Sequence, residues 1–370
     1  MSNLVTPQVI APPPPVSYAL HIADSRVGLR FAPMLAQVLP GLCASGVRIS
    51  LVSDDETLLA RFAGTPVDTV FQPALDGWRG RALAHLLRTR FATGPELVHV
   101  WGTGGLWWAR RWAARKRLPL IVHVLGMQQA ERATALRRSD AEHIALIAAN
   151  LSALPARKAR ALGDRLHVVP PGIATQAGAR HPVPPDALLT ILCTHEFADL
   201  AGLTVLIDAV SQLRRSGCDL HVALVGGGNG TAAVWRRMRD QGVRACMSLV
   251  DDPRLWEKAL PVVDVCVVPG CQRELSIVPL LTMALGKIVV SSRDQIAEWF
   301  IEDRTTWQFT PGSAQELAYL LTRVRQRHRQ AQELRHLAAE YVRREHALLG
   351  MVDRLLKMYE SAARCSAAAP

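Results

Sequence analysis

Short apolar runs alternate with helical patterns along almost the whole chain, and this alternation restricts the fold more than any other feature of the sequence. The runs are nearly continuous in Val, Ile and Leu, which is typical of strands buried on both faces of a parallel sheet. In the first half they lie at 18–24, 47–53, 97–101, 118–126, 143–151 and 166–171, with helical spacing at 31–45 and 106–117. Strands that alternate with helices predict parallel βαβ units.

A stretch at 170–187 that is rich in Pro, Gly and Ala interrupts this series without any periodicity, so it is the best linker candidate. After it the expected strands are 188–197, 221–227, 246–250, 263–269 and 287–292, with helices at 204–216 and 231–241. A chain of 370 residues has room for two domains of ordinary size. We therefore predict a disordered Pro-rich tail (1–17), an N-terminal Rossmann-like domain (18–173), a linker (174–187), a second Rossmann-like domain (188–345), and a C-terminal helix and tail (346–370) that either stays with the second domain or crosses back to the first.

The composition argues against some classes of protein. The N-terminus has neither a charged segment nor an apolar core before Pro12–Pro15, and no apolar run approaches the ~20 residues of a membrane span, so we expect a cytoplasmic protein. The seven cysteines form no CxxC pair or Cys/His cluster, so no metal site is predicted. The net charge of +11 suits an anionic partner. However, the basic stretch at 323–346 has no aromatic stacking platform, so we expect a solvated helix face there and no nucleic-acid site.

Several landmarks occur in a recognisable order, at 167–173, 190–213, 221–230, 263–270, 278–292 and 346–361. In this order they resemble the donor domain of the group 1 (family 4) retaining glycosyltransferases, and 23–30 and 122–126 resemble the first domain more loosely. The resemblance implies the GT-B fold, an α/β fold of two Rossmann-like, doubly wound parallel-sheet domains that face each other across a cleft. It also implies retaining, metal-independent transfer of a sugar from a nucleotide-sugar donor to a glycan or lipid-linked acceptor, with no cofactor.

The chain departs from this family where the donor is bound. The family holds the donor diphosphate with an Arg and a Lys about five residues apart, and here Glu196 and Ala201 occupy the corresponding places. The family also uses two Glu with seven residues between them. In two alternative alignments, this chain offers Arg273 with Leu281 or Glu274 with Thr282. Because neither alignment supplies both carboxylates, a catalytically inactive relative that acts as a binding or partner protein stays open as an alternative.

The candidate donor site combines this resemblance with the loops after the predicted strands, because ligands of open parallel sheets bind beyond the C-terminal strand ends. Glu274 is the catalytic candidate, expected to face the donor sugar. A helix that starts near 276–278 would offer backbone amides to the phosphates, and Arg26 and Arg273 would neutralise charge. The predicted donor-binding residues are Arg26, Gly28, Gly227, Gly228, Asn229, Arg273, Ser276, Ile277, Val278 and Thr282. Each group also has a structural alternative. Glu274 would be a surface carboxylate, Arg26 and Gly28 would lie in a solvated loop, the glycines at 226–230 would form a tight turn, and 276–278 would be an ordinary helix cap.

On the acceptor side we single out His99, His123 and Gly126. A histidine in the cleft could assist catalysis, because the pKa of an imidazole lies near neutrality. A hydrogen-bonded core histidine is the commoner arrangement, so a purely structural role for both histidines is the alternative.

The segment 101–117 combines Trp107, Trp108 and Trp112 with five basic residues. Tryptophan with Arg and Lys on one helix is typical of a helix that lies in a membrane interface. Packing of these tryptophans on the first sheet is the alternative. Peripheral contact with the inner face of a membrane is therefore an open prediction.

Overall fold

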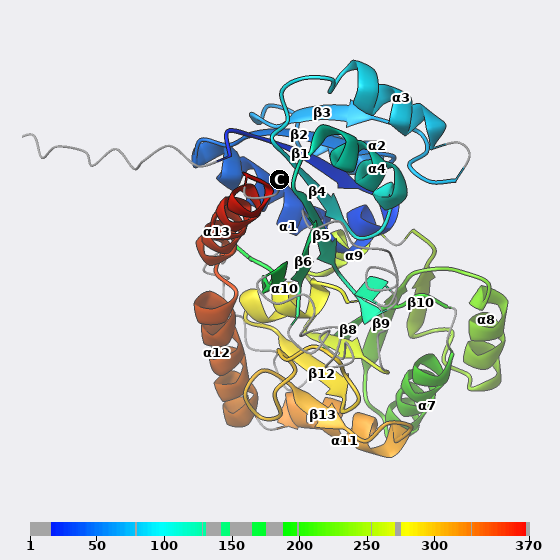
Figure 1. Ribbon diagram of the computed structural model, residues 1–370. Coiled ribbons are helices and arrows are strands. Elements are labelled where there is room, and N and C mark those ends of the chain that lie inside the picture. The colour runs from blue at the N-terminus through cyan, green and yellow to red at the C-terminus, as the bar shows by residue number, and fades with distance from the viewer. Residues whose placement is uncertain are drawn as a thin grey trace, which may run out of the picture.

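The computed structural model describes residues 16–77, 80–127, 129–130, 142–148, 165–174, 188–197, 200–252, 254–270, 275–326 and 328–367. These residues form two parallel sheets with helices on both faces of each, one above the other in Figure 1. This arrangement confirms the predicted α/β class with two doubly wound parallel sheets.

The first sheet has the strand order β3-β2-β1-β4-β5-β6-β7, and all its pairs are parallel. Its strands are β1 (Tyr18–Ala23), β2 (Arg48–Ser53), β3 (Asp68–Phe71), β4 (Leu97–Trp101), β5 (Leu120–Val124), β6 (Glu142–Leu146) and β7 (Leu166–Val168). The helices between them are α1 (Ser25–Ala44), α2 (Glu56–Ala60), α3 (Arg81–Thr89) and α4 (Leu106–Lys116). The direction in which successive strands are added reverses between β1 and β4.

The second sheet has the order β10-β9-β8-β11-β12-β13, also entirely parallel. Its strands are β8 (Leu189–Thr194), β9 (Leu220–Val225), β10 (Met247–Val250), β11 (Val265–Val268), β12 (Ile288–Ser292) and β13 (Trp307–Phe309). Its helices are α7 (Ala201–Arg215), α8 (Thr231–Asp240), α9 (Trp256–Ala259), α10 (Val278–Ala284), α11 (Ala314–Gln326) and α12 (His328–Glu345). Here the direction reverses between β8 and β11.

The sequence pattern located the long strands, and the structure corrects it at short elements and at one helix start. Strands β3 and β13 were not predicted, because they have only four and three residues and therefore show no clear apolar run. Helix α1 begins at Ser25, six residues before the predicted start at Phe31. Asp24 caps this helix, since its carboxylate accepts a hydrogen bond from the Val27 amide at 3.1 Å.

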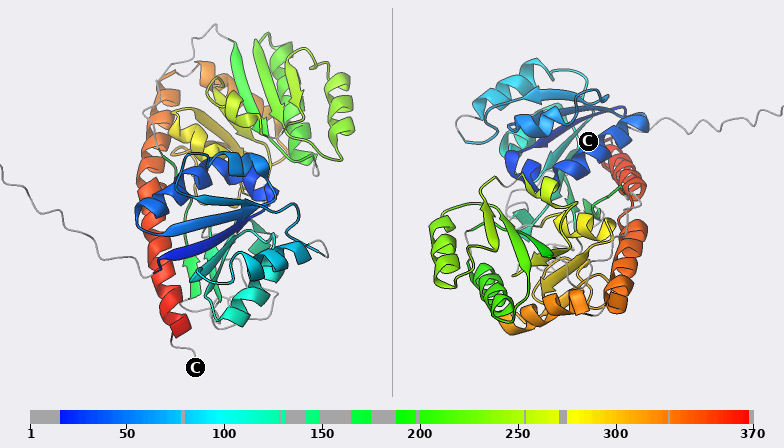
Figure 2. Two further views of the ribbon diagram at one scale, coloured as in Figure 1. Left: turned by 90° about the horizontal axis from the view of Figure 1, so that it is seen from above. Right: turned by 180° about the vertical axis from the view of Figure 1, so that it is seen from behind.

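The last two helices connect the two halves of the molecule. Helix α12 packs on α10, whereas α13 (Leu348–Ala367) packs on α1, so the chain returns to the first sheet. Figure 2 shows α12 and α13 following one another along one side of the molecule. The returning segment runs beside the outgoing one, because the Ile173 amide donates to the His346 carbonyl at 2.7 Å.

The length and apolar composition of helix α1 would also suit a membrane span. Its buried residues include Phe31, Leu35 and Leu39, and the helix packs on β2 and α13. These contacts are those of a core helix in a globular domain.

Candidate functional site

The two points where the strand order reverses face each other across the boundary between the sheets. In doubly wound sheets, ligands bind outside the carboxyl ends of the strands at such points. The loop after β1 leads directly into α1, and Arg30 of α1 forms an ion pair with Glu196 in the loop after β8. Nearby, the Leu275 amide donates to the Leu125 carbonyl, which follows β5, at 3.2 Å. The candidate site is therefore the region where the loops of both sheets meet.

On the first sheet, a glycine-rich loop at 102–105 follows β4 and lies against the start of α1. A Cβ atom on Gly104 would lie 2.5 Å from the Cβ of Asp24, so only glycine allows this approach. Gly102 also has a φ of 76°. The sequence pattern predicted only the helix at 106–117, which follows this loop. The feature that could have indicated this loop is the set of three glycines, Gly102, Gly104 and Gly105, directly after a buried strand.

The predicted residues of α1 lie in a helix and not in the loop expected for them. Arg26 is in the first turn, where its guanidinium pairs with the capping carboxylate of Asp24 at 2.7 Å. Gly28 is buried, and a Cβ there would collide with the carboxylate of Asp55. Close packing against Asp55 is therefore a structural reason for this glycine, and Arg26 already has an acidic partner.

On the second sheet, the glycine turn at 226–230 packs directly on the loop after β8. A Cβ on Gly226 would collide with the carbonyl oxygen of His195, and the φ of Gly226 is 147°. Gly227 leaves room for the carboxylate of Asp251, while Gly228 lies against the Phe197 backbone. Asn229 is exposed beside them. The turn thus holds the two loops together, which is the structural alternative considered for these glycines.

The start of α10 is more enclosed than the sequence suggested. Ile277, Val278 and Thr282 are buried, and the Thr282 hydroxyl donates to the Val278 carbonyl at 2.7 Å. The Val278 amide already donates to the Ser276 hydroxyl at 3.2 Å. The Thr282 side chain therefore points into the core. Glu274 lies outside the described residues, as does Arg273.

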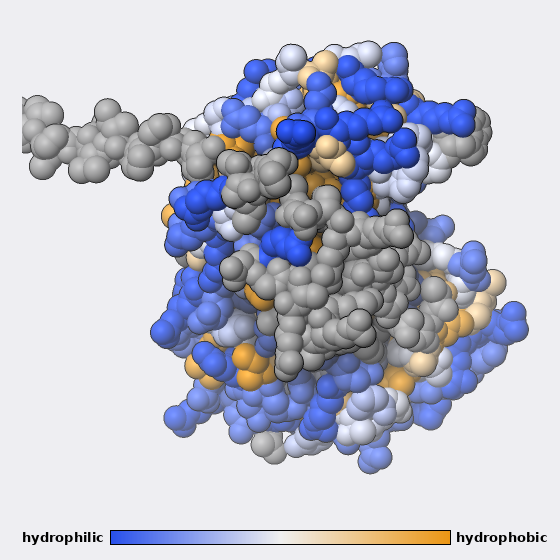
Figure 3. Space-filling view, viewed as in Figure 1, coloured by the Kyte–Doolittle hydropathy of each residue, from blue (hydrophilic) through white to orange (hydrophobic). Residues whose placement is uncertain are grey.

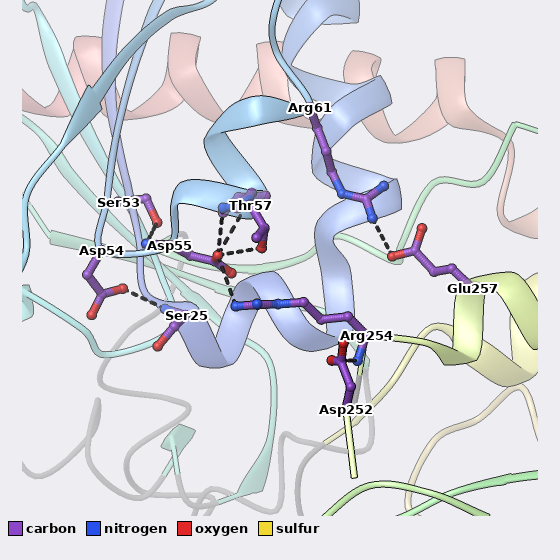
Figure 4. A network of polar contacts seen from close by, with 10 residues as sticks. Ser25, Ser53, Asp54, Asp55, Thr57, Arg61, Asp252, Arg254 and Glu257 are labelled. Carbon is purple, nitrogen blue, oxygen red and sulfur yellow. Dashed lines mark hydrogen bonds and ion pairs between the residues drawn. The ribbon is translucent and has the colours of Figure 1, made fainter. Parts of the chain in front are cut away.

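Polar contacts between the two halves lie beside the candidate site (Figure 4). Arg254, after β10, donates to the buried carboxylate of Asp55 at 3.2 Å, and Arg61 pairs with Glu257 at 2.5 Å. Next to them, the Trp256 indole donates to the Leu29 carbonyl at 3.2 Å. Sequence reasoning did not find these residues, because the contacts join positions that are 196 to 227 residues apart.

The two histidines predicted for the acceptor side are part of a buried cluster on the first sheet. His99 contacts the Tyr359 hydroxyl of α13 at 2.9 Å and His123 at 3.3 Å, and Tyr359 also contacts His21 at 3.1 Å. Burial lowers the pKa of His21 and of His123 to about 3. Such fully buried, mutually bonded side chains have the geometry of core histidines. Gly126 is buried as well.

Metal binding finds no support in the described part of the chain. None of its His, Cys, Asp and Glu side chains form a group of three or more that could hold a metal ion.

Comparison with known proteins agrees with this architecture. The family model of the group 1 glycosyl transferases matches residues 189–327, which span the second sheet. None of the curated proteins matches the chain. Among solved structures, HepE of Anabaena in complex with UDP and glucose has a TM-score of 0.73 at 15% identity and covers 93% of this chain and 100% of its own.

Two other solved structures are similar over the same share of the chain. Sucrose-phosphate synthase from Thermosynechococcus elongatus has a TM-score of 0.71 at 15% identity, covering 93% of this chain and 98% of its own. A glycosyltransferase from Rickettsia africae has a TM-score of 0.69 at 13% identity, with the same coverage. At these identities the likeness concerns the fold, and it confirms the predicted GT-B architecture.

Proposed function

We propose that this chain, whose residues 189–327 match the group 1 glycosyl transferases, moves a sugar from a nucleotide-sugar donor to a glycan or lipid-linked acceptor. The family match of the second half is the observation that carries the proposal. The position of the two strand-order reversals supports the proposal. The elements that follow them are in contact through Arg30 and Glu196, and a ligand bound there would contact both sheets. HepE, which has the same fold, is complexed with UDP and glucose. We extend the proposal to a retaining reaction that needs no metal.

In this proposal the second half binds the donor. Glu274 orients the donor sugar, and Arg273 neutralises charge on the diphosphate. The backbone amides of Ser276 and Ile277 stabilise the negative charge that develops on the leaving phosphate. The Val278 amide has a smaller part, because the Ser276 hydroxyl already accepts its hydrogen bond.

A binding protein without catalysis is the second candidate, and two observations favour it. Glu196 places a carboxylate in the loop after β8, next to where a diphosphate would lie. Thr282, which one alignment pairs with Glu274, is buried with its hydroxyl bonded inside α10. Such a protein would bind a glycan, a nucleotide or a partner transferase.

Calorimetric titration with UDP, GDP and their sugar derivatives tests the donor site. We expect micromolar binding of one nucleotide, weakened about tenfold in Glu274→Ala or Arg273→Ala through the loss of a charge-assisted contact. Glu333→Ala, at an exposed position of α12, serves as the matched control and should bind like the wild type. If the folded protein binds none of these nucleotides, the transferase proposal is wrong.

We further propose that α3 and α4 form a membrane-facing surface. The exposed basic residues there are Arg81, Arg88, Arg90, Arg111, Arg115, Lys116 and Arg117, and neither 77–95 nor 97–130 contains an acidic residue. Trp107 is 50% exposed and lies under the Arg111 guanidinium, whereas Trp112 is buried. In Figure 3 the end of the molecule where Figure 1 places α3 and α4 is mostly blue, with apolar residues between. Basic and exposed aromatic side chains together suit an anionic bilayer.

Sedimentation with lipid vesicles tests this surface. We expect binding to phosphatidylglycerol vesicles and little binding to phosphatidylcholine vesicles, with the anionic binding lost at high salt. The double variant Trp107→Ser/Arg111→Gln should bind about tenfold more weakly, since each basic residue contributes about 1 kcal/mol near such a surface. The control is Trp235→Ser, because Trp235 is an exposed tryptophan beside Arg244 on the second half. Equal binding of all three proteins would contradict the proposal.

A further inference from the structure

The ion pair between Arg30 and Glu196 connects the two halves next to β1 and β8, and each of these strands adjoins a strand-order reversal. Arg30 comes from α1, which follows β1, and Glu196 comes from the loop after β8. We propose that Arg30 binds the donor diphosphate, and that Glu196 occupies the guanidinium until the donor displaces its carboxylate. This inference rests on the proposed function, because it names the anion and the residue that receives it.

The two partners differ in burial, and this difference assigns their roles. The Arg30 side chain is 17% exposed, so its surroundings hold the guanidinium in place, whereas the Glu196 side chain is 68% exposed. The backbone around Glu196 is held by neighbouring hydrogen bonds, from the His195 amide to the Val225 carbonyl at 3.0 Å and from the Phe197 amide to the Gly227 carbonyl at 3.3 Å. The carboxylate can therefore rotate into solvent without a change in the loop.

Two other basic side chains form ion pairs across the boundary among the described residues, and both lack this freedom. Arg254 donates to Asp55, whose side chain is 3% exposed and also caps α2. Arg61, directly after α2, pairs with Glu257 of α9, whose side chain is 27% exposed, and these helices follow β2 and β10, which do not adjoin a strand-order reversal. Among these three pairs, only Arg30 combines a held guanidinium with an acidic partner that is largely in solvent.

The chemistry of the pair suits a diphosphate. The guanidinium presents a planar fork of donors that fits phosphate oxygens as well as it fits a carboxylate. An ion pair with so exposed a carboxylate contributes little, so a doubly charged diphosphate would displace it readily. Glu196 therefore competes with the diphosphate for the Arg30 guanidinium. After it is displaced, its carboxylate stays close enough to repel the bound phosphates.

Substitution of the two residues should therefore change nucleotide affinity in opposite directions. We expect Arg30→Gln to weaken the binding of a nucleoside diphosphate about tenfold through the lost charge-assisted contact. We expect Glu196→Gln to strengthen it roughly fivefold, because competition and repulsion disappear together. If the pair served only to hold the halves together, both substitutions would act in the same direction.

Calorimetric dissociation constants for UDP, GDP and ADP, measured on the full chain, test this inference. Arg61→Gln and Glu257→Gln are the matched controls, since they break another ion pair across the same boundary, and neither should change affinity by more than about twofold. Thermal unfolding followed by circular dichroism checks that each variant is folded.

The outcomes separate the two proposals. Opposite shifts for Arg30→Gln and Glu196→Gln, with unchanged controls, support the inference. If a nucleotide binds but Glu196→Gln weakens binding, Arg30→Gln has no effect, or the controls shift equally, the inference is overturned while the proposed function stands. If no nucleotide binds to the folded wild type or to Glu196→Gln, the proposed function is overturned and this inference with it.

Discussion

Replacing Gly226 by alanine is expected to lower the free energy of unfolding by about 3 kcal/mol or more. The added Cβ would collide with the His195 carbonyl oxygen, which belongs to backbone and cannot rotate away as a side chain could. The φ of 147° adds backbone strain for any residue with a side chain. The loop after β8 would have to move, so nucleotide binding should be lost as well.

Urea-induced unfolding of Gly226→Ala and Gly242→Ala separates the collision from the backbone strain. Gly242 has a φ of 69°, but a Cβ there would meet no atom within 4 Å. We expect the control to lose only about 1 kcal/mol. Equal losses for the two variants would show that the contact with His195 does not restrict the turn.

Lowering the pH from 7 to 5 is expected to destabilise the protein by on the order of 5 kcal/mol through its buried histidines. Burial lowers the pKa of His21 and of His123 to about 3, and it holds the pKa of His99 well below its usual value. Below pH 6.5 the unfolded chain therefore binds protons that the folded chain does not. Stability should fall as the pH drops from 6.5 toward 3, and it should be fully present above that range.

The measurement is the free energy of unfolding in urea at pH 7, 6 and 5, for the wild type and for His123→Phe. The variant keeps an aromatic ring on the sheet but removes one of the three groups, so its loss between pH 7 and 5 should be smaller by about 2 kcal/mol. A wild-type stability that does not change over this range would show that the cluster accepts protons without unfolding.

Much of the fold could be predicted because its signals are local. A strand buried on both faces needs a continuous apolar run, and each of the eleven predicted runs overlaps an observed strand, such as β4 at Leu97–Trp101. Strand β3 escaped prediction because it is short and half of its four residues are exposed. The start of α1 was not predicted because its first turn holds Arg26 and Gly28 and shows no apolar spacing, and the local signal for it was the capping residue Asp24.

The candidate site was predicted less well, because its chemistry depends on side-chain direction and on partners far along the chain. Thr282 looked like a donor-site residue from its spacing, yet the helix turns its hydroxyl inward. His99 and His123 looked like acid–base candidates, yet Tyr359 of the last helix covers His99. The contact between His99 and Tyr359 has no local signature, because the two residues are brought together only when α13 returns to the first sheet.

By itself the sequence determined the series of buried parallel strands and the helices between them, because hydrophobic burial leaves a periodic record within each segment. It also determined the family resemblance of the second half, through the order of its landmarks. Only the tertiary structure decided which charges meet. Arg30 and Glu196 are 166 residues apart, and their pairing follows from two sheets that place their strand-order reversals face to face. Local periodicity carries no information about such an encounter, because it depends on how the two halves pack and not on the residues beside either partner.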